Sequence, residues 1–370
     1  MALTEIESFG HEQVIFCHNA EAGLKAIIAI HDTTLGPALG GLRMRPYASD
    51  AEALRDVLRL SRGMTHKAAA AGLNLGGGKA VIVGDPKKDK SEALFRAFGR
   101  AVESLGGRYV TAEDMGTDVN DMEYIFMETA AVTGIDTSHG GSGDPSPFTA
   151  LGVLQGMRAA AEVVYDGAGI EGKRVAIQGL GHVGHNLVRL CLEEGAKVVA
   201  CDIDDERIDS VRAEFPQVEV VPNETIYDAD VDIFAPCAMG SAIREETIDR
   251  IRAKIICGAA NNQLDRDELG AELMRRGVLY APDYVVNAGG LMNVSLELEG
   301  YSRERALRLT RGIYYNTIKI LRLARSEGIP TNEAADEMAR QRIGSLGRVH
   351  NSFSKFRHNR MAGERRFSRS

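Results

Sequence analysis

KRVAIQGLGHVGHNLVRLCLEEGAKVVACD, residues 173–202, joins two apolar runs through a glycine-rich turn and a helix-forming stretch. The apolar spacing predicts strands over Lys173–Gln178 and Lys197–Cys201, with a helix over His185–Glu194 between them. The turn reads Gly-x-Gly-x-x-Gly, and Asp202 ends the second strand 23 positions after the first of these glycines. This order of elements is typical of a doubly wound α/β sheet that binds a dinucleotide.

The residue types in this turn fit the chemistry of a dinucleotide. The first glycine allows a tight turn, the second lets the backbone approach a pyrophosphate, and the third lets the helix pack closely on the strand. Asp202 would accept hydrogen bonds from ribose hydroxyls and repel a 2′-phosphate, and the next three residues add no cation, so NAD is predicted over NADP. The predicted cofactor-binding residues here are Gly179, Leu180, Gly181, His182, Val183, Gly184 and Asp202.

Strand and helix patterns also alternate on either side of this stretch. In the second half, a helix is predicted over Phe148–Val164 and further strands over Val231–Phe234 and Ile255–Cys257, which indicates a parallel doubly wound sheet. The first half is also predicted to be α/β. Its expected strands are Leu24–Ile30, Lys79–Val83 and Tyr109–Ala112, and its expected helices are Ser49–Gly63 and Lys90–Leu105. The Gly40-Gly41 pair and the three glycines before Lys79 are interpreted as loops.

The length of 370 residues predicts two domains, because single hydrophobic cores usually stop growing below this size. The loop SHGGSGDPSP, Ser138–Pro147, carries the strongest turn signal and is the expected hinge. We therefore expect one domain over 1–140, joined by 325–350, and a dinucleotide domain over 141–324. Residues 351–370 are predicted to form a basic, disordered tail, with binding of an anionic partner as the alternative.

The overall composition excludes several classes of protein. The chain is 44% hydrophobic and 26% charged, and no apolar run approaches the length of a membrane span. The start, Met1–His11, lacks the basic and apolar stretches of a secretory signal, so a cytoplasmic protein is expected. A net charge of −8 argues against a nucleic-acid surface on the main body. The five cysteines form no C-x-x-C pair, and no metal site is predicted.

Two lysines and one aspartate are candidates for acid–base chemistry. Lys79 follows three glycines, but the P-loop pattern fails because Leu73 replaces its first glycine and Ala80 its Ser or Thr. A partly buried lysine beside a second one, such as Lys67, would have a lowered pKa and could act as a base. Asp114, at a strand end, would supply the partner carboxylate. The alternative for either lysine is a solvated surface charge.

Several longer motifs occur in one consistent order between about His11 and Gly344. Together they resemble the glutamate/leucine/phenylalanine/valine dehydrogenase family, and the leucine and valine branch in particular. The motifs are LGPALGGLRM (35–44), GMTHK (63–67), GLNLGGGK (72–79), TAED (111–114), DPSP (144–147) and NAGG (287–290).

This resemblance implies a substrate domain first, an NAD domain second and a cleft between them. It implies that Lys67 binds the substrate α-carboxylate, while Lys79 and Asp114 perform the proton transfers in a reversible oxidative deamination that gives a 2-oxo acid and ammonia. It also implies that the chain is a homo-oligomer, with the first domain involved in oligomerisation. Thr149 and Asn261 would bind the nicotinamide part of NAD. The other expected substrate-site residues are Gly40, Gly41, Met64 and Asn287.

The resemblance also predicts an apolar L-amino acid as substrate. Glutamate-specific members carry a lysine just before the Gly-Gly pair and a hydroxyl residue late in the chain, whereas this chain has Leu39 and Val294 there. Leu291 is expected beside them. Leucine, isoleucine and valine are therefore the predicted substrates. Two alternatives remain: another NAD-dependent dehydrogenase, such as one acting on a hydroxy acid, and a non-catalytic NAD-binding regulatory protein.

Overall fold

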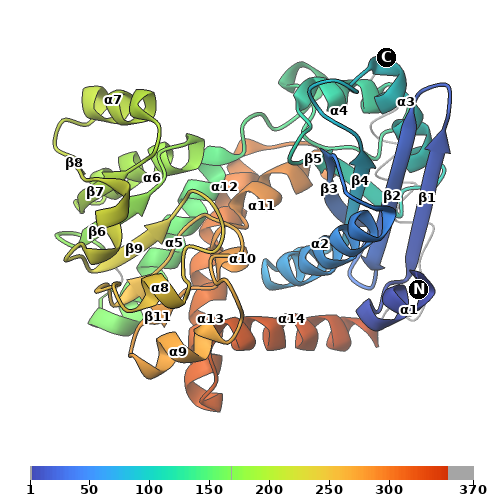
Figure 1. The fold of residues 1–370 in the computed structure, drawn as a ribbon. Helices are drawn as coiled ribbons and strands as arrows, with labels where there is room; N and C mark the ends of the chain where they lie inside the picture. The colour runs from blue at the N-terminus through green and yellow to red at the C-terminus, as the bar shows by residue number, and fades with distance from the viewer. Residues whose placement is uncertain (1, 168, 349–370) are drawn as a thin grey trace. The chain divides into compact units, whose positions relative to one another are not determined.

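The computed structural model describes residues 2–167 and 169–348 and divides them into two units. Unit 1 contains 2–143, 294–303 and 339–348, and unit 2 contains 144–293 and 304–338. Each unit is a sheet covered by helices (Figure 1). The predicted α/β class is thus confirmed for both halves of the chain. The predicted basic tail, 351–370, lies outside the described residues.

The boundaries of the units differ from the predicted ones because of specific contacts. Helix α14 (Thr331–Gly347) begins in unit 2, where Asp336 accepts a hydrogen bond from the Tyr284 hydroxyl at 2.7 Å. Its end belongs to unit 1, because Arg342 donates to the carbonyl of Leu73 at 2.6 Å. The return to unit 1 therefore starts at residue 339 and not at 325.

A second short segment, 294–303, also belongs to unit 1. Its Glu297 is 1% exposed and accepts backbone N–H groups of Gly134 at 3.1 Å and Ser142 at 3.0 Å. One buried carboxylate thus fixes two points of the chain just before the boundary at Gly143. Sequence periodicity gave no sign of this return, because it depends on contacts between residues far apart in the sequence.

Unit 1 is built on a five-stranded sheet in the order β1-β2-β4-β3-β5. Its strands are β1 (Gln13–Asn19), β2 (Leu24–Asp32), β3 (Ala38–Arg45), β4 (Gly76–Val83) and β5 (Tyr109–Glu113). The strands β4, β3 and β5 are parallel, and β1 and β2 are antiparallel to their neighbours. Its first helices are α1 (Ala2–Phe9), α2 (Asp50–Ala70), α3 (Glu92–Glu103) and α4 (Val119–Phe126).

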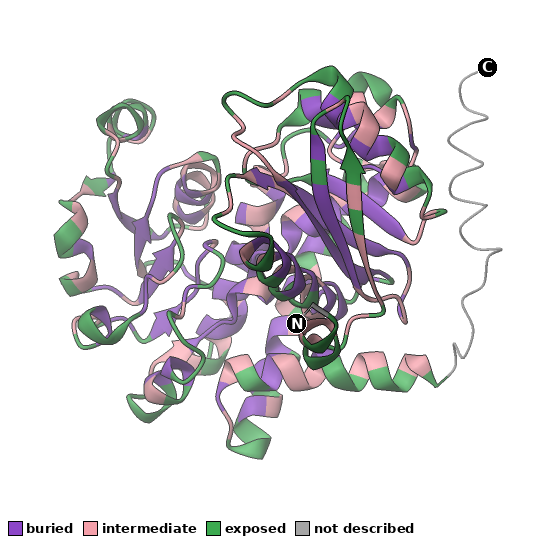
Figure 2. Cartoon of the chain, turned by 45° about the vertical axis from the view of Figure 1, so that its right-hand side comes forward, coloured by how far each residue is buried: buried purple, intermediate pink, exposed green. Residues whose placement is uncertain are grey.

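Alternation along the strands distributes the unit 1 core over both faces of the sheet. Ile27 and Ala29 of β2 pack with α2, whereas their neighbour Ile28 packs with Phe95 and Phe98 of α3. Figure 2 shows buried residues filling the central strands of both units, while the outer sides of the helices are exposed. The helix α2 therefore covers one face of the sheet, and residues of β3 and β4 that point to this face lie beneath it.

The prediction that the glycine runs form loops was wrong, because both runs lie inside strands. Gly40 belongs to β3 and Gly78 to β4, and a Cβ on Gly40 would lie 1.7 Å from the carbonyl oxygen of Gly78. A Cβ on Gly77 would lie 2.1 Å from the backbone nitrogen of Thr65 in α2. These glycines permit close approach of neighbouring backbone, a use that glycine serves in strands as well as in turns.

Unit 2 carries the predicted doubly wound sheet, with six parallel strands in the order β11-β10-β9-β6-β7-β8. Its strands are β6 (Arg174–Gln178), β7 (Lys197–Cys201), β8 (Glu219–Val220), β9 (Ile233–Pro236), β10 (Ile255–Ile256) and β11 (Leu279–Tyr280). After β6 the chain adds β7 and β8 on one side of this strand, and it then adds β9, β10 and β11 on the other side of β6. This switch point is where open α/β sheets bind their ligands.

Two groups of helices cover the two faces of the unit 2 sheet. The core on one face joins α5 and α6 to the strands, and the core on the other face joins α8 and α9 to them. The helices of the second half are α5 (Ser146–Tyr165), α6 (His182–Glu193), α7 (Asp205–Glu214), α8 (Glu245–Ile248), α9 (Leu269–Arg275), α10 (Asp283–Val286), α11 (Gly289–Ser295), α12 (Arg303–Arg311) and α13 (Ile313–Glu327). Among the described residues, no helix is both long and apolar enough to cross a membrane.

Candidate active site

The predicted pair Lys79 and Asp114 forms a buried ion pair in unit 1. The Lys79 Nζ lies 2.6 Å from Asp114 Oδ2, and only 8% of the Lys79 side chain is exposed. Lys79 lies in β4 and Asp114 directly follows β5, so the pair reaches across the intervening strand β3. Gly41 of β3 makes this possible, because a Cβ there would lie 2.8 Å from the Asp114 Cβ.

The strand register brings several predicted residues to the face that α2 covers. Leu39 and Gly41 alternate onto the same side of β3, and Leu39 pairs with Gly77, which lies against Thr65 of α2. Lys79 follows Gly77 by two positions on β4 and shares this side. Leu39 is 2% exposed. Gly40 points to the opposite side, where its carbonyl accepts the Tyr109 hydroxyl at 2.7 Å.

The other predicted substrate residues of unit 1 come from α2 and from the returning segment. Met64 and Lys67 are half-buried and lie three positions apart, so they share one side of the last turns of α2. Val294 is half-buried and begins the segment 294–303.

Neighbouring backbone and side chains fix the position of the Asp114 carboxylate. The Asp114 N–H donates to the Thr117 hydroxyl at 3.0 Å, and this hydroxyl donates to the carbonyl of Leu42 in β3 at 2.8 Å. Arg43 of β3 contacts the carboxylate as well, with Nε 3.3 Å from Asp114 Oδ2. The same oxygen therefore receives Lys79 and Arg43.

The surroundings shift the proton equilibria of both partners. Burial lowers the pKa of Lys79 below that of a free lysine, against the opposing effect of Asp114, and the positive charge of Arg43 lowers it further. For Asp114, burial alone would raise the pKa, but the Lys79 ammonium and Arg43 outweigh burial and lower it. Lys79 can therefore lose its proton more readily than an exposed lysine, while Asp114 stays a carboxylate.

The sequence analysis named Lys67 as the neighbouring positive charge, and the structure adds a second cation, Arg43, which also lowers the pKa of Lys79. Arg43 follows Gly41 by two positions, so alternation along a strand was the signal that could have placed it on the same side. That signal was lost because the glycine pair was interpreted as a loop.

In unit 2 the glycine-rich turn has the geometry of a dinucleotide site. Gly179 has a φ of +102° and a Cβ on Gly184 would lie 1.9 Å from its carbonyl oxygen, so neither position admits a side chain. A Cβ on Gly181 would meet nothing closer than 3.8 Å, which leaves room for a ligand against the backbone. Helix α6 begins at His182, which is exposed, rather than at the predicted His185. These residues therefore fit a bound pyrophosphate.

Asp202 lies beside this turn and carries a neighbour that the sequence did not reveal. Its Oδ2 accepts the Leu180 N–H at 2.5 Å, and its side chain is only 5% exposed. Arg207, on α7, places NH1 3.8 Å from the same Oδ2 and pairs with Asp204 at 3.2 Å. The sequence analysis considered only the three residues after Asp202, which carry no cation, whereas the next helix supplies Arg207.

Asn287 contacts another predicted residue of unit 2, Asn261. Its Nδ2 donates to Asn261 Oδ1 at 2.8 Å and to the Ala259 carbonyl at 3.1 Å. Thr149, in the first turn of α5, donates to the Pro145 carbonyl at 3.2 Å, and a Cβ on Gly290 would lie 2.7 Å from its Oγ1. Leu291, in α11, is 8% exposed.

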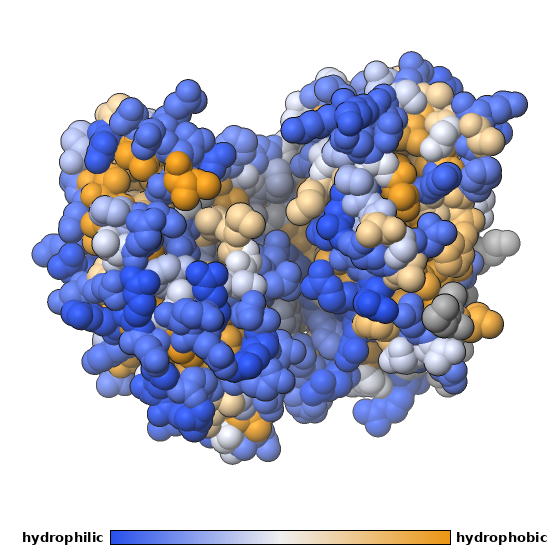
Figure 3. Space-filling view, in the orientation of Figure 1, coloured by the Kyte–Doolittle hydropathy of each residue, from blue (hydrophilic) through white to orange (hydrophobic). Residues whose placement is uncertain are grey.

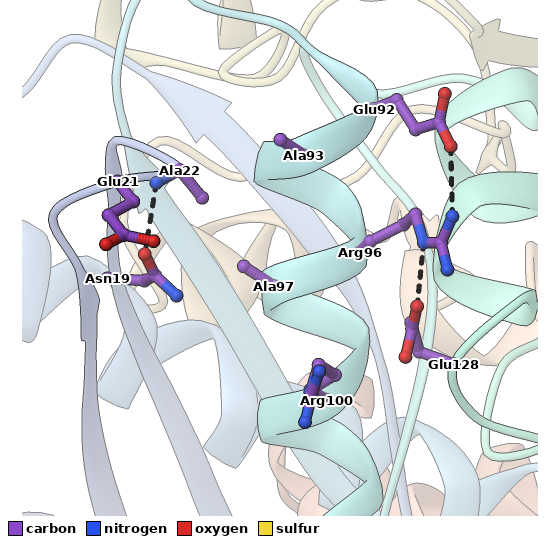
Figure 4. A pocket seen from close by; sticks show the side chains of 9 residues that line it. All are labelled: Asn19, Glu21, Ala22, Glu92, Ala93, Arg96, Ala97, Arg100 and Glu128. Atoms are coloured by element: carbon purple, nitrogen blue, oxygen red, sulfur yellow. Dashed lines mark hydrogen bonds and ion pairs between the residues drawn. The ribbon is translucent and has the colours of Figure 1, made fainter.

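A surface hollow of about 650 Å³ lies elsewhere in unit 1 (Figure 4). It lies between the β1–β2 turn and α3, and none of the predicted site residues lines it. Its Arg96 is already paired with Glu92 at 3.1 Å and Glu128 at 2.7 Å. Within the described residues no group of three or more His, Cys, Asp or Glu could hold a metal ion. In the view of Figure 3, hydrophilic side chains cover most of the surface, and apolar ones form small separate patches.

Models of the Glu/Leu/Phe/Val dehydrogenase family match most of the chain. The model of the dimerisation domain matches residues 11–131, and the model of the remaining domain matches residues 140–206 and 202–310. A leucine dehydrogenase of Thermoactinomyces intermedius is 53% identical over 94% of this chain and 95% of its own length. A phenylalanine dehydrogenase of Bacillus thermotolerans is 48% identical over 93% and 91%.

Solved structures show the same similarity in three dimensions. The crystal structure of L-tryptophan dehydrogenase from Nostoc punctiforme superposes with a TM-score of 0.84 at 44% identity. The superposition covers 94% of this chain and 99% of that one.

Proposed function

Because the chain belongs to the glutamate/leucine/phenylalanine/valine dehydrogenase family, we propose that it catalyses the NAD-dependent oxidative deamination of branched-chain L-amino acids. The observation that carries this proposal is the buried Lys79–Asp114 pair, whose nitrogen and oxygen lie 2.6 Å apart. Such a pair supplies a base and a carboxylate at one point, as the hydrolysis of an imine requires. The nearly full-length similarity to a leucine dehydrogenase supports the substrate class.

In the proposed mechanism this chain's residues bind the amino acid and move protons. Lys67 binds the α-carboxylate and orients the substrate. The glycine-rich turn and Asp202 would hold NAD, which would supply the acceptor for the α-hydrogen as a hydride, so that an iminium would form on the substrate. Neutral Lys79 takes a proton from water as the water attacks the iminium carbon, and Asp114 carries protons to and from the nitrogen. The products are the 2-oxo acid and ammonia, and the sequence of steps is reversible.

The direct test is an assay of leucine, isoleucine and valine with NAD, followed by the appearance of NADH. We expect turnover of all three, together with stoichiometric release of ammonia. Turnover of the corresponding 2-hydroxy acids in place of the amino acids would identify a different dehydrogenase. Binding of NADH without any turnover would identify a non-catalytic NAD-binding protein.

Self-association and location complete the proposal. The match of residues 11–131 to a dimerisation domain supports a homo-oligomer. The edge strand β1 presents Phe16, which is 60% exposed, and such a strand offers unpaired backbone groups to a second chain. A cytoplasmic location stays a prediction of the sequence.

The first quantitative prediction concerns the choice between NAD and NADP. The unmodified enzyme should prefer NAD, because the Asp202 carboxylate repels a 2′-phosphate. Replacing Asp202→Ser should raise kcat/KM for NADP by about tenfold, which corresponds to ~1.4 kcal/mol, because the repulsion of the 2′-phosphate is removed and Arg207 remains as a cation.

The control for this variant is Asp205→Ser, which removes an exposed carboxylate from the start of α7. It should leave the ratio of kcat/KM for the two cofactors unchanged. Equal kcat/KM for NAD and NADP in the unmodified enzyme would contradict the role of Asp202.

The second prediction concerns pH. Burial lowers the pKa of Lys79, yet the group must still lose its proton before it can act as a base. The neutral fraction therefore grows as pH rises, and kcat/KM for deamination should increase over the pH range below that in which an exposed lysine loses its proton. A flat profile over this range would mean that no such base limits the reaction.

A further inference from the structure

A second ion pair, Arg43–Asp56, is joined to the Lys79–Asp114 pair through Arg43. The Arg43 guanidinium sits between two carboxylates, with Nε 3.3 Å from Asp114 Oδ2 and NH1 3.1 Å from Asp56 Oδ2. The exposed side-chain fractions of Arg43 and Asp56 are only 16% and 11%. The four charges thus alternate in sign from Lys79 through Asp114 and Arg43 to Asp56.

The far end of this row is anchored on α2. The Tyr47 hydroxyl donates to Asp56 Oδ2 at 2.9 Å, and Arg59 lies 3.3 Å from the other oxygen. Asp56 is therefore held from two sides and fixes one edge of the Arg43 guanidinium. A guanidinium has donors in a rigid planar arrangement, so fixing one edge also fixes the direction in which Nε points.

We propose that Arg43 and Asp56 are positioning residues for the Lys79–Asp114 pair: Arg43 holds the Asp114 carboxylate against Lys79, and Asp56 fixes Arg43 and offsets part of its charge. This inference rests on the proposed function, because it assigns Lys79 the role of the base. Neither residue touches the substrate in this assignment. They act through Asp114 and through their charges.

Titratable groups near Lys79 come from several elements packed on β4, including β2, which pairs with β4 at Lys79 and carries the half-buried His31. Asp114 follows β5, Arg43 lies in β3 and Asp56 in α2, while β4 carries Lys79 itself. Other titratable groups on these elements are Tyr47 and Arg59, which both contact Asp56, the buried Tyr109 of β5, and Lys67 in the last turn of α2.

Burial is the largest influence and lowers the pKa of Lys79. Among the charges, Arg43 also lowers it, whereas Asp114 and Asp56 raise it. Removing Arg43 or Asp56 should therefore shift the proton equilibrium of Lys79 in opposite directions. If the two residues only held α2 on the sheet, removing them would not shift the pKa of Lys79 in opposite directions.

The experiment measures the pH dependence of kcat/KM for leucine deamination in Arg43→Gln and Asp56→Asn. The rising limb should move to higher pH by about half a unit to one unit in Arg43→Gln and to lower pH by a similar amount in Asp56→Asn, as expected for one partly compensated charge nearby. Arg43→Lys keeps the charge and should leave the limb near that of the unmodified enzyme, although it loses the planar geometry.

The matched control is Arg96→Gln. Arg96 lies in α3, whose buried side chains pack on the other face of the sheet, and its Nε pairs with Glu128 at 2.7 Å. Its removal should leave the limb in place. If Arg43→Gln does not fold, the downward shift in Asp56→Asn still tests the proposal on its own.

A readout without turnover separates this inference from the proposed function. Competitive acetylation of Lys79 in the resting protein, followed across pH by mass spectrometry, reports its proton equilibrium directly. Opposite shifts in the two variants support the inference whether or not the protein deaminates amino acids. The inference would be overturned if kcat/KM fell at every pH in both variants while the pH profile of kcat/KM and the acetylation curve of Lys79 kept their midpoints. An unmodified enzyme without turnover would instead contradict the proposed function.

Discussion

Replacing Lys79→Ala should abolish deamination while leaving NAD affinity nearly unchanged. Loss of a positioned base typically costs about 10²- to 10⁴-fold in rate, and here the same change also removes the cation that contacts Asp114. The predicted dinucleotide residues lie in unit 2 and Lys79 in unit 1, and the change leaves every residue of the glycine-rich turn as it is. The measurement is kcat together with the Kd for NADH from its fluorescence.

The control is Lys90→Ala in the same unit. Lys90 pairs with Asp118 at 2.8 Å and Asp121 at 2.5 Å, so its removal also breaks contacts of a lysine with two carboxylates. Its two carboxylate partners belong to the N-terminal turn of α4 and not to the Lys79–Asp114 pair, so kcat should be retained within a few-fold. Residual activity of Lys79→Ala close to that of the control would show that Lys79 is not the base.

Local patterns were sufficient to predict the dinucleotide half of the fold. The strand, turn, helix and second strand over 173–202 depend on residues close in sequence, and β6, α6 and β7 occupy nearly the predicted positions. Local patterns did not predict the structure where backbone segments far apart in the sequence approach each other closely. The glycines of β3 and β4 are strand residues only because another strand or helix lies against them, which no local signal reveals.

The site shows the same division between local and long-range information. Lys79 and Asp114 were identified from motifs, but Arg43 was not, because its contacts with residues 13 and 71 positions away depend on strand register. Arg207 was missed for a related reason: it reaches Asp202 from the following helix. In both cases the missing group is the counter-ion of a residue that the motifs did identify.

Glutamate should be a far poorer substrate than leucine, because the two positions that distinguish the branches of the family are aliphatic in this chain. Leu39 is 2% exposed and shares one side of β3 with Gly41, next to Asp114. Val294 is half-buried in the same unit. Neither side chain can donate a hydrogen bond to a distal carboxylate, and burying that charge without a partner costs several kcal/mol. A penalty of even about 3 kcal/mol corresponds to roughly 100-fold in kcat/KM.

The experiment compares kcat/KM for leucine, isoleucine, valine, phenylalanine and glutamate with NAD. The three branched-chain substrates should differ only modestly, since single methylenes are worth about 1–3 kcal/mol, and Leu291 should favour the smaller side chains. Phenylalanine should react less well than leucine. Leu39→Lys should raise kcat/KM for glutamate and lower it for leucine, because it buries a cation where an aliphatic side chain was. A glutamate value in the unmodified enzyme equal to that of its best aliphatic substrate would refute the assignment of Leu39 and Val294 to the substrate pocket.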